Sequence, residues 1–179
     1  MDRRGVELEM LAIGCQLNDS QAWEELVVQW HPRLCGYVFQ MVGNQSEVDD
    51  IVQTIWTKIL RSLVNLQNPA GLEAWIFQIA RRTVMDHLRA AYRQPCKSEL
   101  PDLIDSDVPL DDWITREDLA VQLARLHPAE RELLVLHYLQ DLPLADVADL
   151  CGLPVGTVKS RLHRARRSLW VILQGENDE

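Results

Sequence analysis

The sequence predicts an all-α protein with two small helical domains, which are joined by an acidic linker, and with a helix-turn-helix in the C-terminal domain. Apolar residues recur at intervals of three and four along most of the chain, whereas the alternation typical of strands is nearly absent. Residues 94–112 interrupt this periodicity with three prolines and with six acidic residues against one lysine. We therefore predict an N-terminal domain at 1–93, a flexible linker at 94–112 and a C-terminal domain at 113–179.

Composition excludes several classes of protein. The 179 residues are 47% hydrophobic and 25% charged, as in globular proteins. The chain has no long apolar run, and its first residues lack the apolar core of a signal peptide, so we expect a cytoplasmic protein without membrane insertion. The four cysteines form no CxxC pair and the five histidines are isolated in sequence. We therefore expect no disulfide framework, no metal site and no cofactor.

The N-terminal half predicts a series of long helices. Asp19 and Ser20 are suited to start one of them, and Pro32 is expected to kink or end it. Ser46 is expected to cap the next helix, with Asp49 at its third position. That helix carries apolar residues at alternating intervals of three and four: Val48, Ile51, Val52, Ile55, Trp56, Ile59, Leu60 and Leu63. After a loop at 68–71, a further helix begins near Leu72.

The C-terminal half ends in the pattern of a helix-turn-helix. Helical spacing at Leu144, Val147 and Ala148 is broken by residues 151–154 and restarts at Val155. Residues 155–170 carry five basic residues and no acidic one, although the whole chain has 18 Lys and Arg against 27 Asp and Glu. Because charge interactions are screened beyond about 10 Å, this local charge matters more for DNA binding than the net charge. The alternative is a solvated basic face on an ordinary surface helix.

A helical wheel separates the sides of this last helix. The side expected to face the core consists of Val155, Val158, Leu162, Ala165 and Leu169. The opposite side, which would reach a DNA groove, consists of Gly156, Ser160, His163, Arg164 and Arg167. Basic residues that flank the buried stripe are suited to phosphate contacts: Lys159, Arg161 and Arg166.

Several motifs, in the same order, resemble those of bacterial RNA polymerase sigma factors, most closely the small extracytoplasmic-function (ECF) group. GLPVGTVKSRLHRARRSL and the residues before it resemble the family's C-terminal DNA-binding domain. AWEELVVQWHPRL resembles the start of its N-terminal domain, EVDDIVQTIW its polymerase-binding helix, and AWIFQIARRTVMDHLRAAYR the helix that handles the −10 promoter element. The resemblance covers about Asp19 to Leu173. It implies a protein that is not an enzyme but binds core RNA polymerase and gives it promoter specificity.

The resemblance implies that the C-terminal domain reads duplex DNA at the −35 element through the major groove. The candidates for −35 binding are Thr157, Lys159, Ser160, Arg161, His163, Arg164 and Arg167. Within this set, the wheel favours Ser160, His163 and Arg164 for base contacts. It favours Lys159 and Arg161 for the DNA backbone.

The resemblance also implies that the N-terminal domain melts the −10 element and captures it as a single strand, which needs a base pocket beside a positive groove. The candidates for −10 binding are Arg61, Asn65, Leu66, Gln67, Arg82, Asp86 and Arg89. Arg82 stands where the family often has asparagine, and the loop at 61–71 lacks the aromatic and Arg-Gly residues often found there. The promoter sequence therefore does not transfer from relatives.

The candidates for core polymerase binding are Asp49, Asp50, Gln53 and Trp56. Asp50 and Gln53 are spaced i, i+3 and share one helix face, which suits the helical coiled coil that family polymerases offer. The alternative is that Asp49 and Asp50 only favour the helix N-terminus through its dipole.

Partners and rival functions complete the expectations. The resemblance implies an anti-sigma factor that covers DNA- or polymerase-binding surfaces. It also implies that the acidic linker runs toward the active-site cleft and RNA exit channel of polymerase, where its charge would mimic nucleic acid, the alternative being a flexible tether. A stand-alone helix-turn-helix regulator of an operator is the alternative function. The basic final helix disfavours a third class, helical interaction proteins that do not bind DNA.

Overall fold

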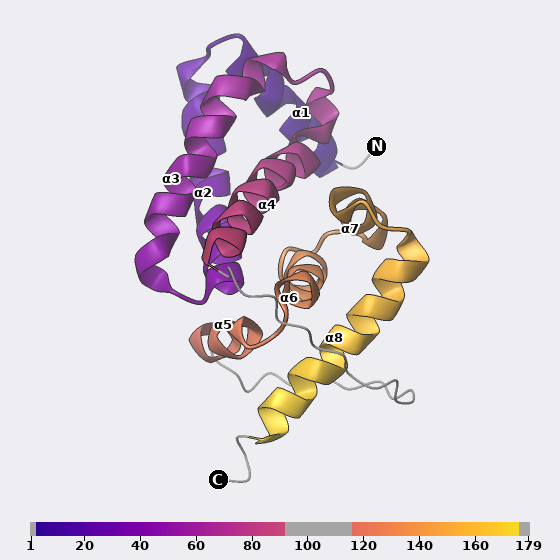
Figure 1. Cartoon of the computed structure of the whole chain (residues 1–179). Coiled ribbons are helices and arrows are strands. Elements are labelled where there is room, and N and C mark those ends of the chain that lie inside the picture. Colours follow the sequence, from indigo (N-terminus) through magenta and orange to yellow (C-terminus); the bar gives the residue numbers. More distant parts are fainter. Residues whose placement is uncertain (1–2, 92–115, 176–179) are drawn as a thin grey trace. The chain divides into compact units, whose positions relative to one another are not determined.

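The computed structural model describes residues 3–91 and 116–175, and every element in these ranges is helical (Figure 1). The predicted all-α fold is therefore confirmed. The first range holds α1 (Arg3–Gln16), α2 (Ser20–Val42), α3 (Gln45–Ser62), the short 3-10 turns η1 (Leu63–Asn65) and η2 (Pro69–Gly71), and α4 (Leu72–Ala91). The second holds α5 (Arg116–Ala124), α6 (Pro128–Leu134), the π-helical turn η3 (Val135–Leu139), α7 (Leu144–Cys151) and α8 (Val155–Gly175).

The chain divides into two compact units. One unit comprises Met1–Val38 with Asn44–His87, and the other comprises Phe39–Gly43 with Leu88–Glu179. The predicted linker at 94–112 lies outside the described residues, so the boundaries proposed for it and for the two domains stay predictions. Within residues 3–91 and 116–175, none of the helices combines the length and the apolar character that crossing a bilayer requires.

Helix α2 begins where the sequence predicts, because the Asp19 carboxylate accepts a 2.9 Å hydrogen bond from the Gln21 amide. It continues past Pro32 to Val42, so the proline does not end the helix. An internal proline costs about 3 kcal/mol. The helix packs Trp30 and Leu34 completely into the core on either side of the proline, and this burial offsets the cost.

The predicted cap of α3 is wrong. Asn44, not Ser46, is the N-cap: its side chain accepts from the Ser46 amide, and its amide nitrogen donates to Glu47 at 2.6 Å. Glu47, and not Asp49, is therefore the third residue after the N-cap, and its side chain bonds back to the cap residue. The helix starts early because Gly43, with φ at +74°, turns the chain directly before Asn44. The predicted apolar stripe is buried at Val48, Ile51, Val52, Ile55 and Ile59.

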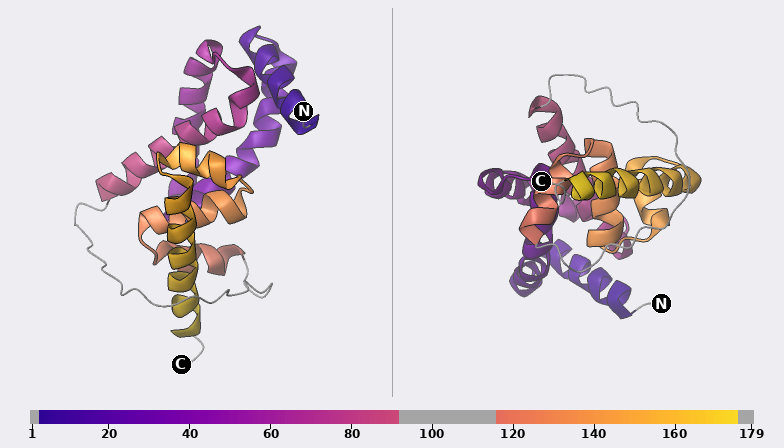
Figure 2. Two further views of the ribbon diagram at one scale, coloured as in Figure 1. Left: turned by 90° about the vertical axis from the view of Figure 1, so that its right-hand side faces the viewer. Right: turned by 90° about the horizontal axis from the view of Figure 1, so that it is seen from below.

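In the C-terminal unit, Pro128 opens α6 as the sequence predicts. Helix α8 contacts α5, α6 and α7, and Figure 2 shows it as one continuous helix. Four of the five residues expected to face the core are buried: Val158, Leu162, Ala165 and Leu169. Val155 differs, with 42% of its surface exposed, because it is the first residue of the helix and lies before the buried stripe begins.

Candidate nucleic-acid interface

The turn between α7 and α8 is closed by backbone hydrogen bonds. Gly152 adopts a left-handed conformation with φ at 65°. The Leu153 amide donates to the Ala148 carbonyl at 2.9 Å, and the Gly152 amide donates to the Asp149 carbonyl at 3.2 Å. This is the pattern of a glycine-terminated helix end, which satisfies carbonyls that α7 leaves open. The turn thus fixes the direction in which α8 leaves the helix-turn-helix.

Helix α8 presents its polar residues on the side away from the buried stripe. Of the −35 candidates, Lys159, Ser160 and Arg164 are exposed. The others are half-buried: Thr157, Arg161, His163 and Arg167. Exposure therefore agrees with the wheel for Ser160 and Arg164, whereas His163 is partly covered.

Side-chain contacts fix the conformation of residues on this polar side and at its flank. The Nε of Arg164 lies 3.3 Å from Oε1 of Glu130 in the first turn of α6. The Ser160 hydroxyl donates to the Thr157 carbonyl at 3.0 Å, which leaves its oxygen able to accept. The guanidinium of Arg166 lies 5.9 Å from the ring centre of Tyr138, a cation–π distance, so this residue is held at the flank of α8.

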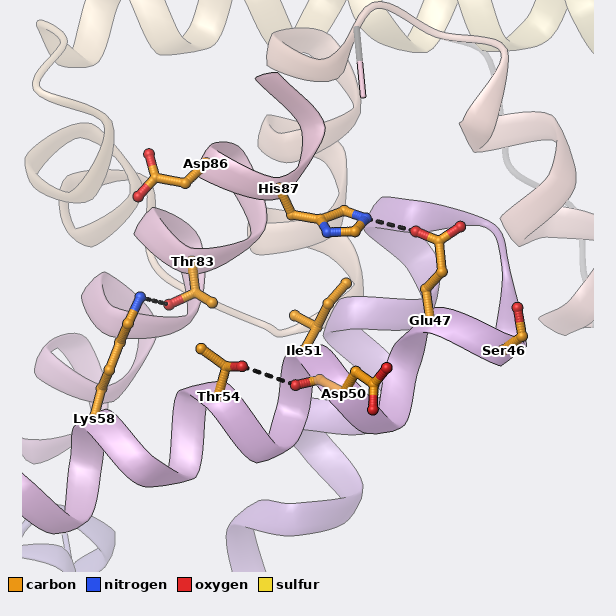
Figure 3. A pocket seen from close by; sticks show the side chains of 9 residues that line it. All are labelled: Ser46, Glu47, Asp50, Ile51, Thr54, Lys58, Thr83, Asp86 and His87. Carbon is orange, nitrogen blue, oxygen red and sulfur yellow. Dashed lines mark hydrogen bonds and ion pairs between the residues drawn. The ribbon is translucent and has the colours of Figure 1, made fainter. Parts of the chain in front are cut away.

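A groove of about 440 Å³ separates the facing surfaces of α3 and α4 (Figure 3). At one end, Nε2 of His87 lies 2.5 Å from Oε2 of Glu47; further along, the Lys58 ammonium donates to the Thr83 hydroxyl at 2.8 Å. The hydrogen bonds from His87 and then from Asn44 hold the pKa of Glu47 below its ordinary value of 4.5. Asp50 is a candidate for polymerase binding and Asp86 is a candidate for −10 binding. Both line this same groove, Asp50 from α3 and Asp86 from α4.

The −10 candidates lie at one end of α3, in the following loop and along α4. Arg61 is in the last turn of α3, and Asn65 ends η1, with Leu66 and Gln67 directly after it. Arg82, Asp86 and Arg89 are exposed at helical spacing on α4. Leu66 is half-buried, whereas the other six candidates are exposed.

The polymerase-binding candidates follow one another along α3. Asp49, Asp50 and Gln53 are exposed, and Trp56 is half-buried. The indole N–H of Trp56 donates to Nδ1 of His31 on α2 at 3.2 Å. Leu60, one turn after Trp56, keeps 57% of its surface exposed, which adds an apolar residue beside the candidates.

Helix α1, which was not predicted from the sequence, holds the loop after α3. The side-chain amide of Gln16 donates to the Leu66 carbonyl at 2.8 Å and to the Leu63 carbonyl at 3.3 Å. Gly14 lets α1 approach α2 closely, since a Cβ there would lie 2.7 Å from that of Ala22. A signal was present: the residues that α1 buries, Leu8, Leu11, Ala12 and Cys15, have helical spacing.

The cysteines that the structure describes form no disulfide: Cys15, Cys35 and Cys151. Burial, followed by the charges of Asp19 and Glu25, raises the pKa of Cys15 to about 11, so this thiol stays neutral. Within 3–91 and 116–175, no group of His, Cys, Asp and Glu side chains is arranged to hold a metal ion.

Comparison with known proteins places both halves of the chain. Residues 26–94 match Sigma-70 region 2, and residues 116–169 match Sigma-70, region 4. The RNA polymerase sigma factor SigZ of Bacillus subtilis is 32% identical over 157 residues, which are 85% of this chain and 87% of SigZ. The ECF RNA polymerase sigma factor SigC of Mycobacterium tuberculosis is 32% identical over 138 residues, which are 74% of this chain and 75% of SigC.

A solved structure shares the fold. The sigma factor RpoE from Bartonella quintana, in complex with the anti-sigma factor NepR, superposes with a TM-score of 0.66 at 23% identity, covering 85% of this chain and 96% of RpoE. The match of residues 26–94 to region 2 excludes the stand-alone regulator, because such a protein has no use for a sigma region 2. Sigma factors are initiation factors rather than enzymes. The chain therefore belongs to the ECF family of RNA polymerase sigma factors and directs promoter-specific initiation of transcription through its regions 2 and 4.

Proposed function

We propose that α8 reads the −35 element with one face. Bases are read by Ser160, His163 and Arg164, and the DNA backbone is contacted by Lys159 and Arg161. Thr157 and Arg167 complete the proposed −35 surface. The supporting observation is that residues 155–170 carry five basic residues and no acidic one, while the opposite stripe is buried. Arginine suits this role because its forked guanidinium pairs with a guanine edge, which is worth about 1–3 kcal/mol of discrimination.

We propose that the loop after α3 and the exposed face of α4 capture the melted −10 strand. The candidates remain Arg61, Asn65, Leu66, Gln67, Arg82, Asp86 and Arg89. The anchoring of the Leu63 and Leu66 carbonyls by Gln16 supports this proposal, because a base pocket needs a loop of fixed shape. Arginines at positions 61, 82 and 89 supply positive charge for the single-stranded backbone.

Asp49, Asp50, Gln53 and Trp56 form the proposed surface for core RNA polymerase, which we name the docking surface. Its support is that three of the four are exposed although they lie on a helix whose other side is packed in the core. The helix-dipole alternative accounts for acidic residues in the first turns of α3, but it gives no role to Gln53, which is exposed, or to Trp56, which is half-buried.

We also propose domain boundaries, a regulator and a location for this chain. We keep 1–93 as the region 2 domain, 94–112 as an acidic linker and 113–179 as the region 4 domain. RpoE was solved in complex with the anti-sigma factor NepR, and we propose that an anti-sigma factor binds and sequesters this protein. A partner of core polymerase acts where the genome is transcribed, so we propose a cytoplasmic location.

A separation-of-function experiment tests the proposal. The full-length protein is titrated with bacterial core RNA polymerase and, separately, with duplex promoter DNA. The variant Asp50→Ala/Gln53→Ala is expected to lose at least tenfold in polymerase affinity and to keep its DNA affinity. Truncating a side chain at the centre of an interface costs about 2 kcal/mol or more of binding free energy. The variant Ser160→Ala/Arg164→Ala is expected to lose DNA affinity and to keep its polymerase affinity. Glu24→Ala, which removes an exposed acid of α2, is the matched control.

Two outcomes of this experiment would contradict the proposal. If both double variants bound polymerase and DNA as the unaltered protein does, neither α3 nor α8 would carry the role proposed for it. If the Glu24→Ala control weakened polymerase binding as much as Asp50→Ala/Gln53→Ala, general charge rather than the docking surface would be responsible.

A further inference from the structure

Trp56 of the docking surface is tied to the neighbouring helix α2. Its indole N–H donates to Nδ1 of His31 at 3.2 Å. The other ring nitrogen of His31, Nε2, lies 3.6 Å from Sγ of Cys35, one turn further along α2. Cys35, His31 and Trp56 therefore form a short chain of hydrogen-bonding groups that crosses from α2 to α3.

The chemistry of the indole decides which tautomer of His31 takes part. An indole nitrogen is a donor only, so Nδ1 must present its lone pair and the ring proton sits on Nε2. The Nε2–H then points to the sulfur of Cys35, which accepts weakly. Each member of the chain thus has a complementary partner, and the neutral imidazole is fixed in orientation by two contacts.

The hydrogen bond to His31 restrains the Trp56 side chain, which would otherwise have to become ordered when polymerase binds. Trp56 is half-buried, and the hydrogen bond that its indole N–H donates to His31 is exposed. The hydrogen bond to His31 selects one orientation of that ring. Restraining a side chain before binding lowers the entropic cost of forming an interface.

We propose that His31 is a positioning residue of the polymerase-docking surface and acts by holding the indole of Trp56 through its Nδ1. The inference rests on the proposed docking role of α3 and extends it to α2. Burial, followed by the charge of Asp49, raises the pKa of the Cys35 thiol.

The test measures the affinity of the full chain for core polymerase in a set of matched variants. His31→Ala removes the acceptor and is expected to weaken binding about three- to tenfold, the range of one hydrogen bond. His31→Asn keeps an acceptor oxygen near the position of Nδ1 and is expected to bind within about twofold of the unaltered protein. In a Trp56→Phe background, which lacks the indole N–H, His31→Ala is expected to have no further effect.

A spectroscopic readout separates positioning from a general structural role. The protein has six tryptophans, so the nitrogen-proton spectrum of the indoles contains one resolvable signal for each. His31→Ala is expected to move the Trp56 signal alone, identified by its loss in Trp56→Phe. Unmoved signals from the other five show that the fold is intact.

Failure of the inference and failure of the docking role look different. If Trp56→Ala weakened binding at least tenfold while His31→Ala bound normally, Trp56 would dock without help and the positioning role would be overturned. If Trp56→Ala itself bound normally, the docking role of Trp56 would be wrong and the inference would fall with it. A His31→Ala effect that persists in Trp56→Phe would also overturn the inference.

Discussion

The Nε of Arg164, the residue best suited to read a base, lies 3.3 Å from Oε1 of Glu130. The carboxylate belongs to the first turn of α6, where the helix dipole favours it, and only 16% of its side-chain surface is exposed, against 55% for Arg164. Because the contact uses Nε, it leaves Nη1 and Nη2 of Arg164 able to donate to a base. Glu130 therefore holds the stem of Arg164 and places a negative charge near the DNA-binding face.

Removing the charge of Glu130 is predicted to alter promoter discrimination. In Glu130→Gln, Arg164 is less restrained and phosphates meet less repulsion, so binding to random DNA should tighten about two- to fivefold, in line with the modest energy of an exposed pair. Promoter binding should tighten less, and the ratio between the two should fall. Competition titrations at fixed salt measure this ratio.

The matched control is Asp149→Asn, which removes one exposed acid from α7 without touching Arg164. If it lowered the promoter-to-random ratio as Glu130→Gln does, net charge rather than the Arg164–Glu130 contact would set discrimination.

Two arginines of α8 are predicted to behave differently. Arg164→Ala should weaken binding to the promoter more than to random DNA, by about 1–3 kcal/mol, because it loses a base contact. Arg166→Ala should weaken both alike, because this residue lies at the flank beside Tyr138. The measurement is a pair of binding titrations on each DNA, and equal losses of specificity in both variants would reject the assignment of faces.

The missed helix α1 yields a third prediction. Gln16→Ala removes the donor to the Leu63 and Leu66 carbonyls, so the loop should loosen and strand opening at the −10 element should fall several-fold, with polymerase affinity unchanged. Thermal unfolding should show a loss of about 1 kcal/mol. Permanganate reactivity of the melted strand measures opening.

Gln29→Ala serves as its control, since the side-chain amide of Gln29 donates to Glu25 on its own helix rather than to the loop. Normal strand opening in Gln16→Ala would show that the loop keeps its shape without α1.

What could be read from the sequence was the periodic part of the fold. The stripes of α3 and α8 were predicted because apolar spacing reports burial directly. The cap of α3 was missed because Asn44 and Ser46 are both good caps and the positive φ of Gly43 chooses between them. The Arg164–Glu130 and Trp56–His31 contacts join separate helices, so no local pattern predicts them.

Acid should weaken the unit that contains α3 and α4. The pKa of Glu47 is lowered by its bonds to His87 and Asn44, so its stabilising contribution is present above about pH 4.5 and is lost as the pH falls through the lower, folded-state value. The free energy of unfolding should therefore differ between the unaltered protein and Glu47→Gln at pH 5.5, by about 0.2–1 kcal/mol because the pair is partly exposed. Chemical denaturation at pH 3–5.5 should show this difference shrinking.

Glu24→Gln, an exposed acid of the same unit, is expected to give a difference that is constant with pH. A Glu47→Gln difference that grew as the pH fell would mean that the folded state does not favour the Glu47 carboxylate.

The most direct test of the account is in-vitro transcription of a genomic DNA library by bacterial core RNA polymerase with the purified protein, followed by mapping of the transcript starts. The account predicts a stable complex with core polymerase and starts that gather at sites sharing one pair of −35 and −10 sequences, with Arg164→Ala scattering or abolishing them. Starts distributed as they are with core polymerase alone, together with no stable complex, would contradict it.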